Sequence, residues 1–347
     1  MNLVSIRYAF TSAYLKAKDA RGIGPDHIDA MLQRASTVQD ALENIRDTDI
    51  GEFLLNQPIR NFTEAEACLW TYLAGCMEKL ERFPLPRDMS VMLTRYKEKF
   101  DVANLKAALR GKLTDETPPM IPLGTLYENG FLELLVDADT PDTIRDILEK
   151  CGLHGYLSIV RDLKENDPRS NFEIEFRLDR HYMKTLLETM AAMSDGRVLG
   201  TALRIMTDLT NLQAVFRTVL REETVPVVDF ILPGGHSFFE ADIRELFSLK
   251  AQELPGKLEG SEYNQTALEI MRSYDKEKSI TVVDRVIEKH KYRLLRNILS
   301  PRAMSPCNLY WYLYLREIEI RNLRLILKSV SEGIAPSEIR DYLVTAL

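Results

Sequence analysis

The histidines and cysteines of this 347-residue chain do not fall into the spacing of a metal site. The five histidines are scattered, and no HExxH motif occurs. Cys151-Gly152-Leu153-His154 offers two soft ligands without a second pair, so a turn after a helix is the better interpretation. The cysteines lie on apolar stretches without CxxC spacing, which favours buried free thiols over disulfides or zinc ligands: Cys68, Cys76, Cys151 and Cys307.

Glycine and serine motifs that could bind phosphate or carry a nucleophile are incomplete. Gly22-Ile23-Gly24 runs into a proline and lacks the third glycine of a phosphate-binding loop. Gly111-Lys112 lacks both the preceding loop and the following Ser or Thr. Ser237 follows a glycine and a histidine, but Phe239 stands where a nucleophile elbow needs glycine. With no two consecutive aspartates for a magnesium motif, we predict no catalytic, cofactor-binding or metal-binding residues.

The composition is that of an ordinary folded protein with a negative net charge. Lys and Arg number 45 against 52 Asp and Glu, a formal charge of −7, and hydrophobic residues make up 45 %. A protein that binds the phosphate backbone of a nucleic acid usually has a basic face, so we expect no nucleic-acid partner. Residues 1–15 lack a signal-peptide core, and the longest apolar run, 309–315, is far shorter than the roughly 20 residues of a membrane span. We therefore expect a cytoplasmic chain without a transmembrane segment.

An internal repeat organises the chain. Residues 101–110, 208–217 and 319–328 share the pattern acid, apolar, any, Asn, Leu, polar, any, apolar, apolar, base. The three asparagines are 107 and 111 residues apart (211 − 104 and 322 − 211). This period is too long for a helical solenoid and indicates a triplicated domain. We predict domains at 1–120, 121–231 and 232–347.

Further features recur at compatible positions around the repeated segment. Leu178-Asp179-Arg180 and Val283-Asp284-Arg285 precede the second and third copies. Turns at 121–126 and 232–238, each containing Pro and Gly, follow the first and second copies. Short helices with a polar start are expected next, at Thr140–Leu148, Ser248–Leu258 and Thr37–Ile45.

The hydrophobic pattern is helical almost everywhere. Apolar residues recur at i, i+3, i+4 and i+7 in 183–193, 203–220 and 310–330. The stretch 225–232 is the best strand candidate, and an extended linker is an equal alternative. We predict an all-α fold in three similar helical domains.

A helical wheel places the acid of each repeat inside the apolar stripe, so Asp101, Asp208 and Glu319 should be at least partly buried. Because a buried carboxylate needs a partner, we predict that Arg180 pairs with Asp208 and Arg285 with Glu319, and that Asp101 finds another partner. The asparagines are expected to make interhelical hydrogen bonds. Convergence of the three acids on a metal or a proton path remains the functional alternative.

The segment 276–302 holds eight Lys or Arg against three acids in an otherwise acidic chain. A solvated helix face is the simpler interpretation. An electrostatic docking surface for an acidic partner is the alternative.

Taken together, the repeated Asn-Leu helix, the segment Tyr8–Lys16, the Pro233-Gly234-Gly235 turn and the closing helix Tyr312–Lys328 resemble one family. It is the C subunit of archaeal and bacterial V/A-type ATP synthases, called the d subunit in the eukaryotic V-ATPase. Two features depart from that family: the first helix is poor in arginine, and the turn at 121–126 is weak.

The resemblance implies a funnel of three helical domains with pseudo-threefold symmetry and no catalytic activity. Such a protein lies peripherally on the cytoplasmic face of the membrane rotor ring, one copy per complex. It joins the ring of proteolipid subunits to the central stalk and transmits torque. An unrelated all-helical soluble scaffold that binds protein partners is the alternative from a different class, and a metal-dependent all-α enzyme is a third.

Overall fold

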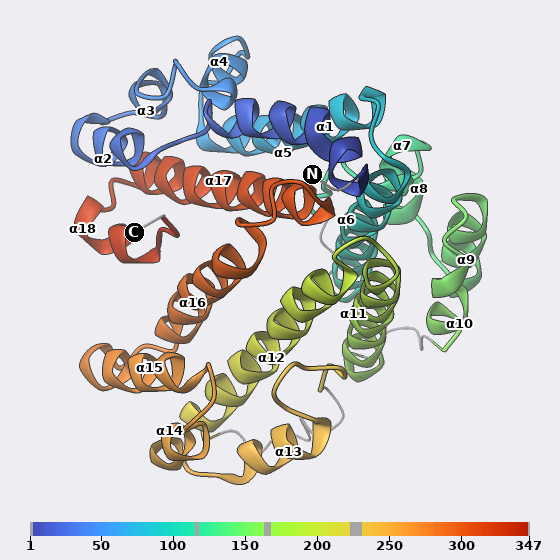
Figure 1. The fold of residues 1–347 in the computed structure, drawn as a ribbon, viewed down its shortest axis with the longest axis vertical. Helices are drawn as coiled ribbons and strands as arrows, with labels where there is room; N and C mark the ends of the chain where they lie inside the picture. The colour runs from blue at the N-terminus through green and yellow to red at the C-terminus, as the bar shows by residue number, and fades with distance from the viewer. Residues whose placement is uncertain (1–2, 115–117, 163–167, 223–230, 346–347) are drawn as a thin grey trace. The chain divides into compact units, whose positions relative to one another are not determined.

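The computed structural model describes residues 3–114, 118–162, 168–222 and 231–345. These ranges hold helices and turns and no strand, so the all-α prediction is confirmed for them (Figure 1). The helices, in chain order, are α1 (Leu3–Asp19), α2 (Pro25–Arg34), α3 (Val38–Glu43), α4 (Asp49–Leu55), α5 (Phe62–Arg82), α6 (Arg87–Thr114), α7 (Thr125–Glu128), α8 (Leu132–Val136), α9 (Pro141–Lys150), η1 (His154–Tyr156), α10 (Leu157–Val160), α11 (Pro168–Ala191), α12 (Gly196–Leu220), α13 (Glu240–Ser248), η3 (Ala251–Glu253), α14 (Leu254–Lys257), α15 (Asn264–Glu277), α16 (Thr281–Leu299), α17 (Pro306–Glu332), α18 (Pro336–Ile339) and η4 (Arg340–Tyr342).

The chain divides into two compact units. The split unit contains 1–73 and 194–347, and the inserted unit contains 74–193. The division falls within α5. In the part of the chain that the structure describes, no helix is both long and apolar enough to cross a membrane.

The inserted unit is built on two long helices, α6 and α11, which pack against each other. The short helices α7 and α8 pack on α6, and α10 packs on α9 and α11. Their apolar faces meet in one core, whose members are fully or almost fully buried: Leu105, Leu109, Leu126, Leu135, Ile144, Val160 and Leu178. This unit therefore supports the first copy of the repeated segment, which lies on α6.

In the split unit, the helices α12 and α16 pack side by side, with α15 along α16 and α13 on α12 (Figure 1). The helix α17 contacts α1, α3, α16 and α18. A second core joins α12 through α16, and its members include Leu209, Leu212, Phe216, Leu246, Tyr263 and Val286. The second and third copies of the repeat lie on α12 and α17.

Local signals in the sequence set several helix ends. Thr37 and Asp40 form a capping box at the start of α3, and Thr140 accepts a hydrogen bond from the Thr143 N–H at the start of α9. Two of the three predicted short helices are therefore confirmed. The third prediction, Ser248–Leu258, was wrong in its start, because Ser248 ends α13 and the chain re-enters helix only at η3 and α14.

The long periodic segments are helical as predicted, except that 192–193 lie beyond the end of α11. The stretch 225–232 falls mostly outside the described residues, and the two that are described, Ile231 and Leu232, are in no regular element. The four cysteines are free thiols, of which Cys307 is buried and the others are half-buried. The domain boundaries at 120 and 231 stay a prediction.

Substituting a core leucine of α12 should test the register of that helix. Leu209 is fully buried, whereas its neighbour Thr210 is exposed. We expect Leu209→Ala to lower the free energy of unfolding by about 3 kcal/mol, since it leaves a cavity. Thr210→Ala is the matched control and should change it by less than about 0.5 kcal/mol. Equal effects in urea unfolding followed by circular dichroism would show that the register is wrong.

Candidate functional site

The acid and the asparagine of each repeat together form a polar clamp on a passing segment of chain. In the first clamp, the Asp101 carboxylate accepts hydrogen bonds from the backbone N–H groups of Thr125 and Leu126, at 3.0 and 2.8 Å. The Asn104 side chain accepts from the N–H of Ile121 at 2.8 Å and donates to the carbonyl of the same residue at 2.9 Å. The turn 121–126 is thereby fixed to the flank of α6 at two points.

The second clamp repeats this arrangement on α12. The Asp208 carboxylate accepts from the N–H groups of His236 and Ser237, at 2.9 and 2.8 Å. Asn211 binds both backbone groups of Leu232, each at 2.9 Å. A third donor, the Tyr263 hydroxyl, reaches Asp208 Oδ2 at 2.9 Å from a site in which the tyrosine is fully buried.

The third clamp, on α17, holds segments near opposite ends of the sequence. Glu319 Oε1 accepts from the N–H of Ile23 at 2.7 Å. Asn322 binds both backbone groups of Val344, donating to its carbonyl at 2.7 Å and accepting from its N–H at 2.9 Å. Here the acid has one backbone donor instead of two, and Arg316, one turn earlier on α17, supplies the balance by an ion pair of 2.8 Å.

A glycine precedes the bound N–H groups in each clamp, where there is little room for a side chain beside the acid. A Cβ added to Gly124 or Gly235 would overlap the carboxylate of Asp101 or Asp208. In the third clamp, a Cβ on Gly22 would lie 2.9 Å from Arg316 Nη2 and 3.3 Å from Glu319 Oε1. Gly124 also has φ of +96°, a backbone conformation that glycine adopts most easily.

A second polar contact recurs two residues after each asparagine, on the outer side of the long helix. Lys106 Nζ lies 2.6 Å from Asp179 Oδ2, and Gln213 Nε2 lies 2.6 Å from Asp284 Oδ1. In the third copy, Arg324 forms an ion pair with Glu66. The acids of these contacts follow fully buried apolar residues in all three copies: Leu178, Val283 and Ala65.

Burial dominates the electrostatics of the clamps. Asp101, Asp208 and Glu319 are 2, 0 and 7 % exposed, so the prediction of burial is confirmed. Desolvation raises the pKa of Asp101 to about 6, although the N–H groups of Leu126 and Thr125 lower it. Desolvation likewise raises the pKa of Asp208 and of Glu319, against the opposing hydrogen bonds and, for Glu319, the Arg316 charge.

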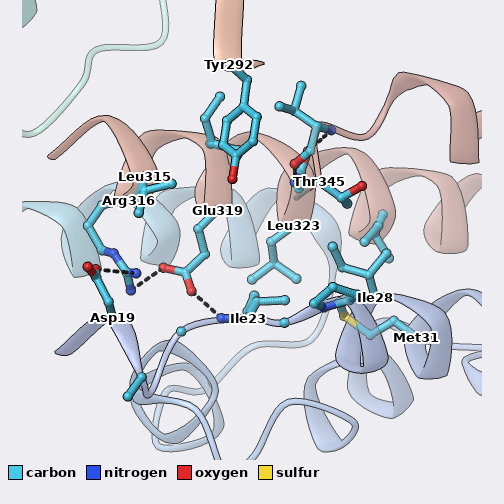
Figure 2. A pocket seen from close by; sticks show the side chains of 18 residues that line it. Asp19, Ile23, Ile28, Met31, Tyr292, Leu315, Arg316, Glu319, Leu323 and Thr345 are labelled. Carbon is cyan, nitrogen blue, oxygen red and sulfur yellow. Dashed lines mark hydrogen bonds and ion pairs between the residues drawn. The ribbon is translucent and has the colours of Figure 1, made fainter. Parts of the chain in front are cut away.

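Beside the third clamp lies a cavity of about 300 Å³ (Figure 2). Along one wall, dashed contacts run from Asp19 through Arg316 and Glu319 to Ile23. The Tyr292 hydroxyl points into the cavity from α16. The remaining wall is mostly apolar, and its members include Ile28, Met31, Leu323, Ile326 and Val344.

The predicted arginine partners need correction. Arg285 pairs with Glu277, with Nη1 3.0 Å from Oε2, so its predicted pairing with Glu319 was wrong. The reason is that the guanidinium is used by α15, which packs directly against α16. Arg180 is exposed and belongs to the inserted unit, whereas Asp208 belongs to the split unit, so that pairing stays a prediction. Asp101 finds another partner as predicted, namely backbone N–H groups.

The prediction that the asparagines join helices to one another was wrong. Each one binds the backbone of a non-helical connection instead. An extended segment leaves its N–H and C=O groups free, and a side-chain amide can satisfy both at once.

Most of the motifs weighed for chemistry lie in turns or at helix ends, whereas Gly111-Lys112 lies within α6. Cys151 ends α9 and His154 begins η1. Ser237 donates its N–H to Asp208 and its hydroxyl to Glu262. A search of the described residues finds no group of three or more His, Cys, Asp and Glu that could hold a metal ion. The predicted absence of catalytic, cofactor and metal residues stays a prediction.

Part of the basic segment 276–302 is neutralised locally. Arg285 pairs with Glu277, Lys278 with Asp275, and Lys291 with Glu288. These contacts favour the solvated helix face, while the docking alternative stays open.

Two residues of the clamps were not found from sequence. Tyr263 lies 55 residues after Asp208 and carried no local signal. Arg316 did carry one, because an arginine three residues before an acid on a helix lies on the same face.

The three clamps recur at the positions of one repeated segment, and the sequence of the whole chain can be compared with known proteins. The sequence profile described as "ATP synthase (C/AC39) subunit" matches residues 11–342. The chain belongs to the ATP synthase C/AC39 subunit family. Curated relatives named as the C subunit of A-type ATP synthase agree with this assignment. Those of Methanocaldococcus jannaschii and Methanothermobacter thermautotrophicus are each 24 % identical and span 97 % of this chain and 86 and 87 % of their own lengths. The relative from Thermococcus kodakarensis is 24 % identical and spans 96 % of this chain and 90 % of its own length.

The match to the C/AC39 family covers the whole of the repeat. The profile begins at residue 11 and ends at 342, so it includes all three copies of the repeated segment. It also includes Ile23, which the third clamp binds, and stops two residues before Val344.

A side chain placed next to Asp208 should disrupt the second clamp. In Gly235→Ala, the new Cβ would overlap Asp208 Oδ1 and must displace the turn. We expect the free energy of unfolding to fall by about 3 kcal/mol. Gly256→Ala is the matched control, since no atom lies within 4 Å of a Cβ there. A similar loss in both variants, measured by urea unfolding, would show that the acid does not restrict this position.

The raised pKa of Asp101 predicts a specific pH dependence. Because the folded-state pKa is about 6 and the ordinary value is 3.8, the unfolded chain loses this proton first as the pH rises. The contribution of Asp101 to stability should therefore fall between pH 4 and 6 and stay constant above, by on the order of 2–3 kcal/mol. Urea unfolding of wild type and Asp101→Asn over this window should show that the free energy of unfolding of the wild type falls relative to that of the variant as the pH rises. Parallel curves would contradict the assignment.

Proposed function

We propose that this chain is the non-catalytic spacer of a rotary V/A-type ATP synthase or ATPase. It joins the ring of proteolipid subunits to the central stalk and transmits torque during ion-coupled ATP synthesis or hydrolysis. Membership of the C/AC39 family is the observation that carries this proposal. The curated relatives are subunits of A-type ATP synthases by name, and the chain matches them over 96–97 % of its own length.

The proposal includes three similar helical domains with pseudo-threefold symmetry. Its support is the recurrence of one set of contacts, because the same acid, asparagine and glycine positions hold the same backbone groups on α6, α12 and α17. The boundaries 1–120, 121–231 and 232–347 divide the sequence evenly. The acid of the third domain, however, binds the loop at Ile23, which belongs to the first of these domains.

A spacer that passes torque must resist deformation where its helices are joined. The clamps meet that need, since each fixes non-helical segments to a long helix by hydrogen bonds that are buried or partly buried. The partners in this proposal are the proteolipid ring and the central-stalk subunits, with one copy of this chain per complex. Its place would be peripheral, on the cytoplasmic face of the membrane, with no nucleic-acid partner. Family membership supports this function over an unrelated soluble scaffold.

Deleting this chain in its own host should separate the head of the complex from the membrane. We expect the proteolipid ring to stay in the membrane fraction, while the catalytic and central-stalk subunits move to the soluble fraction. A tagged wild-type copy should reverse this and recover both sets together from membranes solubilised in mild detergent. Mass spectrometry of the two fractions makes the measurement.

An empty-vector strain and a tagged, unrelated helical protein are the controls. Catalytic subunits that remain attached to the membrane without this chain would contradict the spacer role. Recovery of soluble partners alone, with no ATPase subunits, would favour the scaffold alternative.

A further inference from the structure

The third clamp differs from the other two in the continuity of the chain that it holds. In the first, the segment bound by Asn104 runs on within a few residues to the N–H groups bound by Asp101. The second has the same short connection between Leu232 and His236. In the third, Asn322 binds Val344 while Glu319 binds Ile23, near the other end of the sequence. The segment at Asn322 is therefore attached independently of the loop at Glu319.

The asparagine recognises backbone and not a particular sequence. It binds both the N–H and the C=O of one residue in every clamp, as a neighbouring β-strand would. The bound residue is Ile121, Leu232 or Val344, each followed by different neighbours except for a proline shared by the first two. The common requirement is an extended segment with an aliphatic side chain at the bound position.

The occupant of the third clamp is the closing segment, which we define as residues 339–345. Ile339, Leu343 and Val344 are buried, at 6, 3 and 3 % exposed. Outside this apolar strip, Arg340 pairs with Asp29 on the surface, where both side chains are about half exposed. The Tyr342 and Thr281 hydroxyls lie 3.0 Å apart. These two exposed contacts add little to its attachment, but the buried Arg285 also places its guanidinium 5.1 Å from the centre of the Tyr342 ring.

The connection to the closing segment is exposed along its whole length. Helix α17 ends at Glu332 and is capped by Gly333, whose φ is +67°, and each residue from 331 to 338 is exposed. Movement of this connection would uncover no core. In contrast, the chain on both sides of Leu232 is tied to α12, because Leu232 and Ser237 are bound there and Ile231 is buried.

The loop at Ile23 has its own attachments, which do not involve the closing segment. Glu319 holds its N–H, and Arg316 links Glu319 to Asp19 at the end of α1 (Figure 2). Lys18 pairs with Asp49 at 2.8 Å and fixes the same region to α4. One half of the third clamp can therefore stay closed while the other opens.

We propose that the surface of α17 around Asn322 is a peptide-binding site that reads backbone, and that the closing segment is its displaceable occupant. The ligand class is an extended segment of a different polypeptide, not a second copy of this chain, with an aliphatic residue for the position of Val344. The site goes beyond the spacer function and does not rest on it.

The test uses the full-length chain with a substitution that displaces the closing segment from the site at Asn322. Val344→Asp places a charge where the side chain is 3 % exposed, so the closing segment should leave the site. The probe is a fluorescent peptide of residues 334–347 with the wild-type sequence, titrated by anisotropy. We expect saturable binding to Val344→Asp and at least tenfold weaker binding to wild type, whose tethered segment competes at high effective concentration.

Two further variants show where the probe binds. Asn322→Ala in the Val344→Asp chain should abolish binding, because the backbone pairing is lost. Lys328→Ala in the same chain changes an exposed residue of the same helix and should leave binding unchanged. A probe carrying Val344→Asp should not bind at all. Absence of saturable binding to a folded Val344→Asp chain, or binding that survives Asn322→Ala, would overturn the proposal.

Hydrogen exchange of the wild-type chain gives a second measurement that needs no variant to fold. The amide N–H groups of Val344 and Leu232 donate to equivalent asparagines, both at 2.9 Å. If the closing segment is displaceable, Val344 should exchange at least tenfold faster than Leu232. Equal protection would overturn the proposal. A stable dimer formed by exchanged closing segments would also overturn it, since the occupant would then be a second copy.

Discussion

A carboxylate taken out of water must find donors inside the fold, and this structure supplies them from the backbone. Asp101 and Asp208 each accept two N–H groups from near the end of a turn, and Glu319 accepts one with help from Arg316. The raised pKa values show that these donors do not fully replace hydration. Each connection held by a clamp depends on meeting that requirement, because the glycine, the asparagine and the turn are all placed around the acid.

The sequence predicted the long helices and the burial of the acids because both follow from one periodicity. A wheel at 100° per residue puts each acid within the apolar stripe, whatever lies across from it. The partners of the acids could not be predicted in the same way. They are backbone N–H groups, which every residue except proline has, so the sequence does not show which of them will lie near an acid. Arginine was therefore expected where the structure has turns. Gly22-Ile23-Gly24 was considered only as a phosphate-binding loop. In the structure, the N–H of Ile23 donates to Glu319, which lies near the other end of the sequence.

The outer contacts of the three copies show how much freedom the surface allows. The same position pairs Lys106 with Asp179, Gln213 with Asp284, and Arg324 with Glu66. The charge of the side chains changes between copies while their position stays the same, because these pairs are partly exposed and solvent weakens each of them. The buried asparagine is the same in all three, since any substitution there would leave backbone groups unpaired.

The split third clamp has a consequence for how the chain is made. The first clamp can close once residues 101–126 have left the ribosome, and the second needs residues only up to Tyr263. The loop at Ile23 must wait for Glu319, and Asn322 must wait for Val344. At about 5–20 residues per second, the earliest part of the chain spends roughly 15–60 s without its partner. The loop at Ile23 is thus among the last parts of the chain to reach all of its partners, although Lys18 and Asp49 can pair much earlier.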